Sequence, residues 1–87
     1  MKDYPDVVGL ESIKVIYELI DDEHMAQFKK WGLQRRTLFE WVTYLTEEVG
    51  ELAKAISENE YREGTKEEIT KEAVQVAALA CKIAMII

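Results

Sequence analysis

The segment Thr37-Leu-Phe-Glu40 sets the fold, because it has the form of a capping box at the start of a helix. In such a box the threonine hydroxyl and the glutamate carboxylate each bond a backbone amide that the first helical turn leaves unpaired. The pattern predicts a helix that begins at Leu38 and ends near Glu58 or Asn59. One face of this helix is apolar and is expected to enter the core: Trp41, Leu45, Val49, Leu52 and Ile56.

A second box, Thr65-Lys-Glu-Glu68, follows directly after Gly64. It predicts a further helix that starts near Lys66, with a short connection over residues 60–64. The chain is therefore expected to be all-α.

Upstream of both boxes, a first helix is predicted to begin between Asp6 and Leu10 and to end near Trp31. His24 is expected to be a hydrogen-bonded residue at the edge of the core, outside any site. The 87 residues form one domain, with residues 1–8 as an N-terminal extension and three main helices in an antiparallel bundle. The apolar stripe of the first helix consists of Ile13, Ile16, Tyr17, Ile20 and Phe28.

The charge balance is acidic, with 11 Lys and Arg against 17 Asp and Glu and a formal net charge of −6. A protein that neutralises a nucleic-acid backbone needs the opposite sign, so we expect no nucleic-acid partner. An acidic protein that handles phosphates requires a cation between the two.

The third helix is apolar on nearly all sides after Ala73. The run from Val76 to Ile87 is interrupted by Lys82 and is shorter than the roughly 20 residues that span a bilayer, so we expect a buried helix and no membrane partner. Two short helices cannot cover so much apolar surface. The bundle is therefore predicted to be completed by self-association through this helix, as a homodimer or homotetramer.

Cys81 is the only cysteine and lies in this apolar run. A single cysteine forms no intrachain disulfide, and the N-terminus lacks the apolar stretch of a signal peptide, so a reducing cytoplasm is the expected setting. We predict that Cys81 is a small core residue.

Glutamates cluster on the second helix at Glu47, Glu48 and Glu51, where they repel one another. On a helical wheel Glu48 falls close to the apolar residues Trp41 and Leu45, so it points toward the core. Glu51 lies beside it, and Glu47 lies further toward solvent.

The third helix repeats this anomaly. Glu72 shares a face with Val76 and Leu79, and Gln75 follows one turn later. Gln75 and Lys82 are seven residues apart, which places them on one side of the helix together.

Unpaired carboxylates on a buried face are costly, and a divalent cation with oxygen ligands would offset the cost. Facing helices with carboxylates three residues apart can present such oxygens. The alternative is a solvated face on which the glutamates of the second helix pair with Lys54 and Arg62.

Two motifs, Glu47-Glu48-Val-Gly-Glu51-Leu and Glu72-Ala-Val-Gln75, resemble the ExxE and ExxD motifs of the MazG-like nucleotide pyrophosphohydrolases. The resemblance also takes in Lys30-Trp31-Gly32-Leu33-Gln34 and Trp41, and so runs from the first helix to Ala80. It implies an all-α fold of the NTP pyrophosphatase type.

The resemblance also implies the ligands of Mg²⁺, with Mn²⁺ as a possible substitute. They are Glu48, Glu51 and Glu72, with Gln75 in place of the family's aspartate. Glutamine offers a neutral oxygen without charge, so metal affinity or metal count is expected to differ from the family's.

The implied reaction is hydrolysis of a nucleoside triphosphate to monophosphate and pyrophosphate, by attack of water on the α-phosphorus. A free carboxylate, Glu47 or Glu51, would accept the proton. Lys54, Arg62 and Lys82 are candidates for binding phosphate, and surface ion pairs are the alternative for each.

Trp31 and Trp41 flank the turn between the first two helices, and either could stack on the base, with Gln34 nearby in the sequence. Core packing is the alternative for both tryptophans. A non-enzymatic interpretation also stands, in which loss of the aspartate at Gln75 leaves a nucleotide-binding or oligomerisation module.

Overall fold

A computed structural model describes residues 10–86, which form three α-helices: α1 (Leu10–Trp31), α2 (Leu38–Tyr61) and α3 (Lys66–Ile86). No strand occurs in this part of the chain, so the prediction of an all-α fold is confirmed. The predicted extension, residues 1–8, lies outside the described residues. No helix within residues 10–86 has the length and apolar character needed to cross a membrane.

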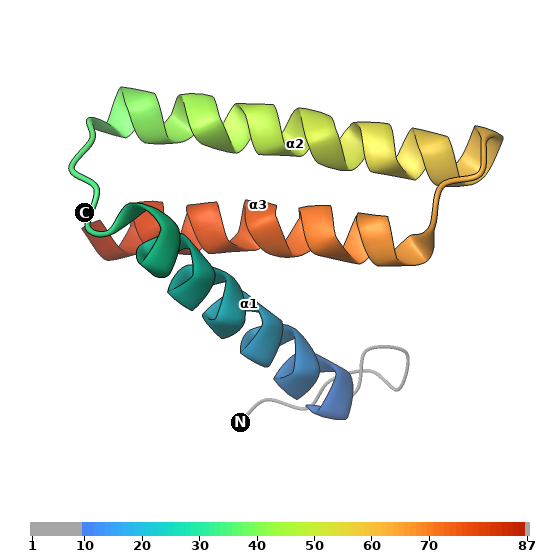
Figure 1. Cartoon of the computed structure of the whole chain (residues 1–87), viewed down its shortest axis with the longest axis horizontal. Helices are drawn as coiled ribbons and strands as arrows, with labels where there is room; N and C mark the ends of the chain where they lie inside the picture. Colours follow the sequence, from blue (N-terminus) through green and yellow to red (C-terminus); the bar gives the residue numbers. More distant parts are fainter. Residues whose placement is uncertain (1–9, 87) are drawn as a thin grey trace.

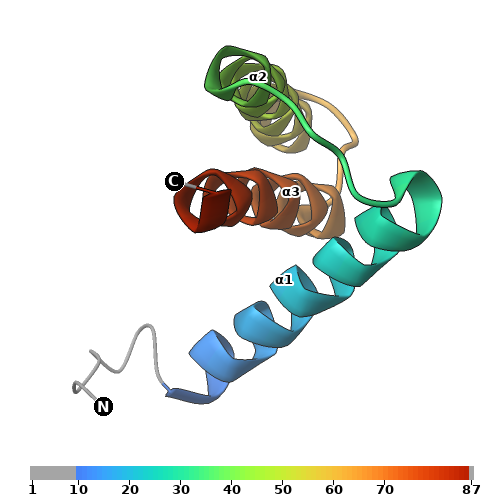
Figure 2. The same ribbon diagram turned by 90° about the vertical axis from the view of Figure 1, so that its left-hand side faces the viewer.

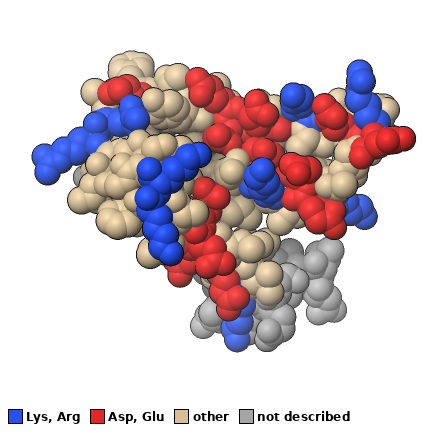
Figure 3. Space-filling model, in the orientation of Figure 1, with Lys and Arg blue, Asp and Glu red and all other residues tan. Residues whose placement is uncertain are grey.

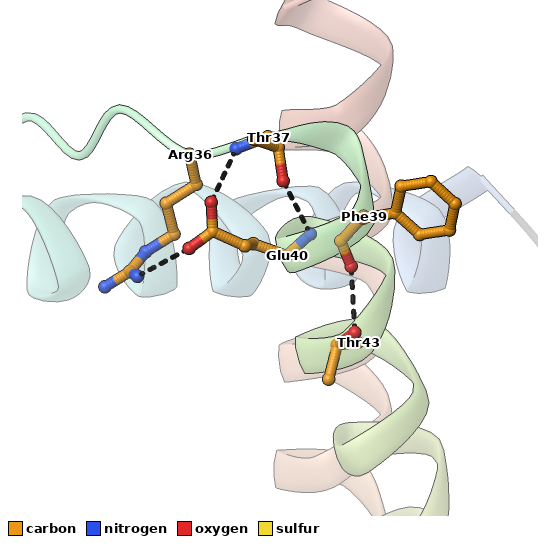
Figure 4. Close-up of polar contacts among 5 residues, drawn as sticks. All are labelled: Arg36, Thr37, Phe39, Glu40 and Thr43. Carbon is orange, nitrogen blue, oxygen red and sulfur yellow. Dashed lines mark hydrogen bonds and ion pairs between the residues drawn. The ribbon is translucent and has the colours of Figure 1, made fainter.

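The start of α2 is fixed by the predicted capping box. Glu40 N donates to Thr37 Oγ1 at 3.1 Å, and Thr37 N donates to Glu40 Oε1 at 3.0 Å. Figure 4 shows this reciprocal pair, with Arg36 reaching the same glutamate from outside the helix. At the start of α3 one half of the second box forms, with Glu68 N donating to Thr65 Oγ1 at 3.2 Å.

Glycines mark two of the helix ends. Gly32 follows α1 with a φ of 67°, a left-handed conformation that glycine adopts at little cost, and its N–H donates to Phe28 O at 2.7 Å. After α2, the N–H groups of Arg62 and Gly64 both donate to Glu58 O. Since α2 continues to Tyr61, it ends two or three residues later than predicted.

The helices α2 and α3 lie side by side and run antiparallel, whereas α1 crosses α3 obliquely (Figures 1 and 2). In the described part of the chain α1 packs against α3 and not against α2. His24 joins the two helices, because its Nε2 lies 3.0 Å from Ala78 O. The prediction that His24 is a hydrogen-bonded residue at the edge of the core is confirmed.

The core of the single chain is small. Among the described residues, the buried hydrophobic side chains are Trp41, Val74, Ala78 and Leu79. The second helix turns Trp41, Leu45 and Leu52 toward α3 as predicted, but Val49 and Ile56 are 46% and 43% exposed. The predicted core stripe of α2 is therefore only partly buried, because α3 covers one flank of it.

Other expected core positions are exposed as well. Cys81 is exposed, so its prediction as a core residue is wrong; because α1 crosses α3 obliquely, it leaves this part of α3 uncovered. The oblique crossing of α1 leaves three of the five residues of its apolar stripe exposed, and apolar residues at the end of α3 are exposed too. The exposed residues in these two regions are Ile16, Tyr17, Phe28, Met85 and Ile86.

Candidate functional site

Two carboxylates from α2 and α3 meet at one side chain. Glu48 is half-buried on α2, and Glu72 and Gln75 are half-buried on the facing turns of α3. With its amide nitrogen turned toward them, Gln75 donates to Glu48 Oε2 at 2.9 Å and to Glu72 Oε2 at 3.0 Å. The wheel prediction that Glu48 and Glu72 point inward together is thus met.

The other orientation of the Gln75 amide has a different meaning. It would place Oε1 in the same position, so that three oxygens would face one another without a proton between them. Such an arrangement is repulsive unless a cation lies among the oxygens. Within residues 10–86 no group of three or more His, Cys, Asp or Glu is arranged to hold a metal ion, so the candidate set is two carboxylates and an amide.

The pKa of Glu48 is raised above its ordinary value. Burial is the largest cause, followed by the charge of Glu72 and a hydrogen bond with it, and then by the charges of Glu51 and Glu23. A negative charge on Glu48 is therefore unfavourable at this position, unless a cation or a shared proton compensates it.

Glu48 and Gln75 also lie in the wall of a cleft of about 380 Å³. The cleft is formed by all three helices and by the connection between α1 and α2. Its lining mixes carboxylates, amides, two cationic side chains and three aromatic rings: Glu23, Gln27, Trp31, Gln34, Arg36, Trp41, Tyr44, Glu48, Gln75, Leu79 and Lys82.

Lys82 lies at one end of a chain of hydrogen bonds in this cleft, and Gln27 is in the middle. Lys82 Nζ donates to Gln27 Oε1, and Gln27 Nε2 donates to Glu23 Oε2 at 2.8 Å. Burial lowers the pKa of Lys82, and the charge of Glu23 opposes that shift. As the seven-residue spacing predicts, Lys82 and Gln75 line the same cleft.

The aromatic part of the cleft contains one exposed and one buried tryptophan. Trp31 is 54% exposed, so core packing does not account for it, and Lys30 Nζ lies 4.7 Å from its ring centroid. Trp41 is only 5% exposed; Lys82 Nζ lies 5.4 Å from its ring and Tyr44 meets it edge-on. Trp41 therefore belongs to the core and forms the floor of the cleft.

Arg36 stands at the rim. Its guanidinium lies 4.9 Å from the centroid of the Tyr44 ring, and its Nη1 lies 3.7 Å from Glu40 Oε2. The Nε of Arg36 is buried without a hydrogen-bond partner. These contacts hold a cationic group beside Trp31 and Gln34.

A second cleft, of about 280 Å³, lies between α2 and α3 further along the pair. Glu51, Lys54 and Glu72 line it. Glu72 thus separates the two clefts, with Gln75 on one side and Glu51 on the other. Among the described residues, no ion pair joins Lys54 or Arg62 to the glutamates of the ExxE motif.

Two predicted site residues lie apart from both clefts. Glu47 is exposed on α2 and lines neither of them. Arg62 caps the far end of α2 through its backbone, with its N–H 2.9 Å from Glu58 O.

The cleft has residues that sequence reasoning did not assign to the site: Glu23, Gln27, Arg36 and Tyr44. Glu23 and Gln27 follow Ile20 on the side of α1 that packs against α3, and that periodicity was the available signal. The oblique angle of α1, which opens the cleft, is not encoded in periodicity.

Acidic side chains gather in a band over the middle of α2 and α3 and continue along α1 (Figure 3). No protein-family model, curated protein or solved structure matches this chain.

Proposed function

We propose that this chain is a Mg²⁺-dependent nucleoside triphosphate pyrophosphohydrolase of the MazG-like type. One observation supports it best: Glu48 and Glu72, which come from two different helices, both lie within hydrogen-bond distance of the same atom of Gln75. The two glutamate motifs resemble the ExxE and ExxD motifs of the MazG-like family. This resemblance implies the reaction, in which a triphosphate yields a monophosphate and pyrophosphate.

The residues present fit a hard cation. Carboxylate and amide oxygens are the ligands that Mg²⁺ prefers, and a turn of the Gln75 amide presents three of them together. Glu51 lies close enough to raise the pKa of Glu48 and adds a further carboxylate beside Glu72. Mg²⁺, when bound, supplies charge neutralisation for the phosphate oxygens and orients the attacking water.

The first cleft fits the rest of the substrate. Its volume of about 380 Å³ lies within the range of small-molecule sites. Lys82 and Arg36 offer positive charge for phosphate oxygens, and Trp31 offers an exposed ring for stacking on a base. Glu51, beside Glu72, is a better placed proton acceptor than the outlying Glu47.

This proposal includes a cytoplasmic setting, as expected from the single cysteine, and self-association, as expected from the apolar third helix. The enzymatic part is tested by pyrophosphate release from a panel of ribo- and deoxyribonucleoside triphosphates, with Mg²⁺, Mn²⁺ or EDTA. We expect release that requires the metal and is lost in Glu72→Gln. Absence of release with every triphosphate and both metals contradicts it.

One observation favours a second candidate, a nucleotide-binding module without catalysis. When the Gln75 amide nitrogen faces inward, it satisfies Glu48 and Glu72 together and no metal is needed. Binding of a non-hydrolysable triphosphate analogue with equal affinity in EDTA and in Mg²⁺, together with no pyrophosphate release, identifies this alternative.

A further inference from the structure

The ammonium group of Lys82 is held in the first cleft by side chains of α1. Its Nζ donates to Gln27 Oε1, and Gln27 Nε2 donates to Glu23 Oε2 at 2.8 Å. The same Nζ lies 5.4 Å from the centroid of the Trp41 ring, within the range of a cation–π contact. We call Glu23 and Gln27 the α1 support of Lys82.

The orientation of the Gln27 amide follows from its two partners. A carboxylate only accepts hydrogen bonds and an ammonium only donates them, so the amide nitrogen faces Glu23 and the amide oxygen faces Lys82. Both residues of the α1 support are half-buried, on the side of α1 that packs against α3. The α1 helix thus presents a neutral acceptor to the ammonium, and a carboxylate stands behind it.

This arrangement leaves the ammonium available to a ligand. Within residues 10–86 no ion pair joins Lys82 to a carboxylate, and Gln27 Oε1 is its hydrogen-bond acceptor. A lysine ammonium has three N–H donors, so it can bond a further acceptor in the cleft. A carboxylate in the place of Gln27 would instead neutralise the charge that attracts an anion.

Glu23 favours the charged form of Lys82 without a direct bond to it. Burial lowers the pKa of Lys82, and the charge of Glu23 opposes that shift. The other charged groups that line the cleft are Arg36, in the connection between α1 and α2, and Glu48 on α2.

Lys82 lies between the two ends of the cleft. The candidate metal ligand Gln75 precedes it by seven residues, or about 10 Å along α3. The exposed ring of Trp31 belongs to the other end, because Figure 1 shows the α1–α2 connection beside the end of α3. A ligand that reaches from Trp31 to Gln75 therefore passes Lys82.

We propose that Lys82 binds the α-phosphate of the nucleotide and that Glu23 and Gln27 are positioning residues, which hold its ammonium at that point of the cleft. This inference rests on the proposed nucleotide site. With the base on Trp31 and the reacting phosphorus beside Gln75, the phosphate nearest the nucleoside lies at Lys82. An N–H of the ammonium then donates to a phosphate oxygen in a charge-assisted hydrogen bond.

The test uses nucleoside monophosphates, which carry only this phosphate. A panel of ribo- and deoxyribonucleoside monophosphates is titrated in Mg²⁺ into the full chain, and the best ligand is then compared among variants. Gln27→Met keeps the length of the side chain but removes both hydrogen bonds, and Gln27→Glu places a carboxylate against the ammonium. Lys29→Gln is the control, since Lys29 is exposed on the same helix, lines neither cleft and changes the net charge by as much as Gln27→Glu does.

We expect both Gln27 variants to weaken binding of the monophosphate by about threefold to tenfold, and Lys29→Gln to bind as the wild type does. The pKa of Lys82, followed by NMR of its side-chain nitrogen, should move in opposite directions. It should fall in Gln27→Met, where burial acts without the acceptor, and rise in Gln27→Glu, where a carboxylate contacts the ammonium. A Gln27 that only packs α1 against α3 would change neither the pKa of Lys82 in Gln27→Met nor the affinity.

The outcomes separate this inference from the proposed hydrolysis. Equal monophosphate affinity in the wild type and Gln27→Met overturns the inference even where pyrophosphate is released, and so does a wild type that binds no monophosphate. Binding that depends on Gln27 supports the inference even where no pyrophosphate is released. If Gln27→Glu does not fold, because its carboxylate meets that of Glu23, the affinity and the Lys82 pKa of Gln27→Met decide alone.

Discussion

Glu48 on α2 and Glu72 on α3 direct their carboxylates to the same atom of Gln75, at 2.9 and 3.0 Å. Two like charges this close on half-buried side chains destabilise the helix pair unless something positive lies between them. An amide proton, a shared proton and a metal ion are three ways to supply it. Each leaves a different experimental signature.

If a metal is the native partner, millimolar Mg²⁺ should raise the melting temperature above its value in EDTA. A ligand present at about 100 times its dissociation constant adds about 2.7 kcal/mol to the free energy of unfolding. Glu72→Gln should lose this shift, whereas Glu67→Gln, an exposed position in the first turn of α3, should keep it. Identical melting curves in EDTA and Mg²⁺ for the wild type would count against the site.

The raised pKa of Glu48 predicts a pH dependence in the metal-free protein. A carboxyl whose pKa is higher in the folded state favours folding below its unfolded pKa of about 4.3, and this advantage is lost as the pH rises through the folded pKa. Glu48→Gln should therefore be more stable than the wild type at pH 7 in EDTA and lose that advantage near pH 4. Urea unfolding at both pH values measures the difference. If the stability difference between Glu48→Gln and the wild type were the same at pH 7 and at pH 4, Glu48 would ionise without a penalty in the folded protein.

Gly64 should tolerate no side chain. A Cβ there would lie 2.9 Å from Asn59 N and from two carbon atoms of Glu58, which are mostly backbone and cannot move aside. We expect Gly64→Ala to lower the free energy of unfolding by about 1–3 kcal/mol. Gly50→Ala is the control: a Cβ at this position would have nothing within 4 Å, and alanine in the helix interior should raise stability by about 0.5–1 kcal/mol. Thermal and denaturant unfolding measure both changes in stability. A change in the same direction for both variants would contradict this account of the α2–α3 connection.

The capping box at Thr37 provides a second stability test. Thr37→Ala removes the hydroxyl that accepts from Glu40 N and should cost about 1 kcal/mol. Thr43→Ala is the matched control on the same helix, since its hydroxyl bonds Phe39 O, a carbonyl already within the helix (Figure 4). That change should be neutral or slightly stabilising. Melting followed by circular dichroism measures both changes. An equal loss of stability in the two variants would show that the box has no special role.

The helices and the inner part of the site were predictable from the sequence for local reasons. The two threonine boxes place the starts of α2 and α3, and the helical period turns Glu48 and Glu72 inward. Periodicity does not contain the angle at which one helix crosses another. The contribution of Gln27 to the cleft and the exposure of Cys81 both follow from that angle, and so only the three-dimensional structure shows them.

The most direct test of the central claim is a calorimetric titration of Mn²⁺ or Mg²⁺ into the wild type, Gln75→Asp and Glu72→Gln. If Gln75, Glu48 and Glu72 hold a cation, Gln75→Asp adds a negative ligand and should tighten binding, with each factor of ten worth about 1.4 kcal/mol. Glu72→Gln should weaken binding in the same experiment. If the Gln75 amide only bridges the two carboxylates, Gln75→Asp adds a third repelling charge and destabilises the protein without changing its response to metal. Unchanged metal affinity in both variants would contradict the claim that this pair of helices holds a metal.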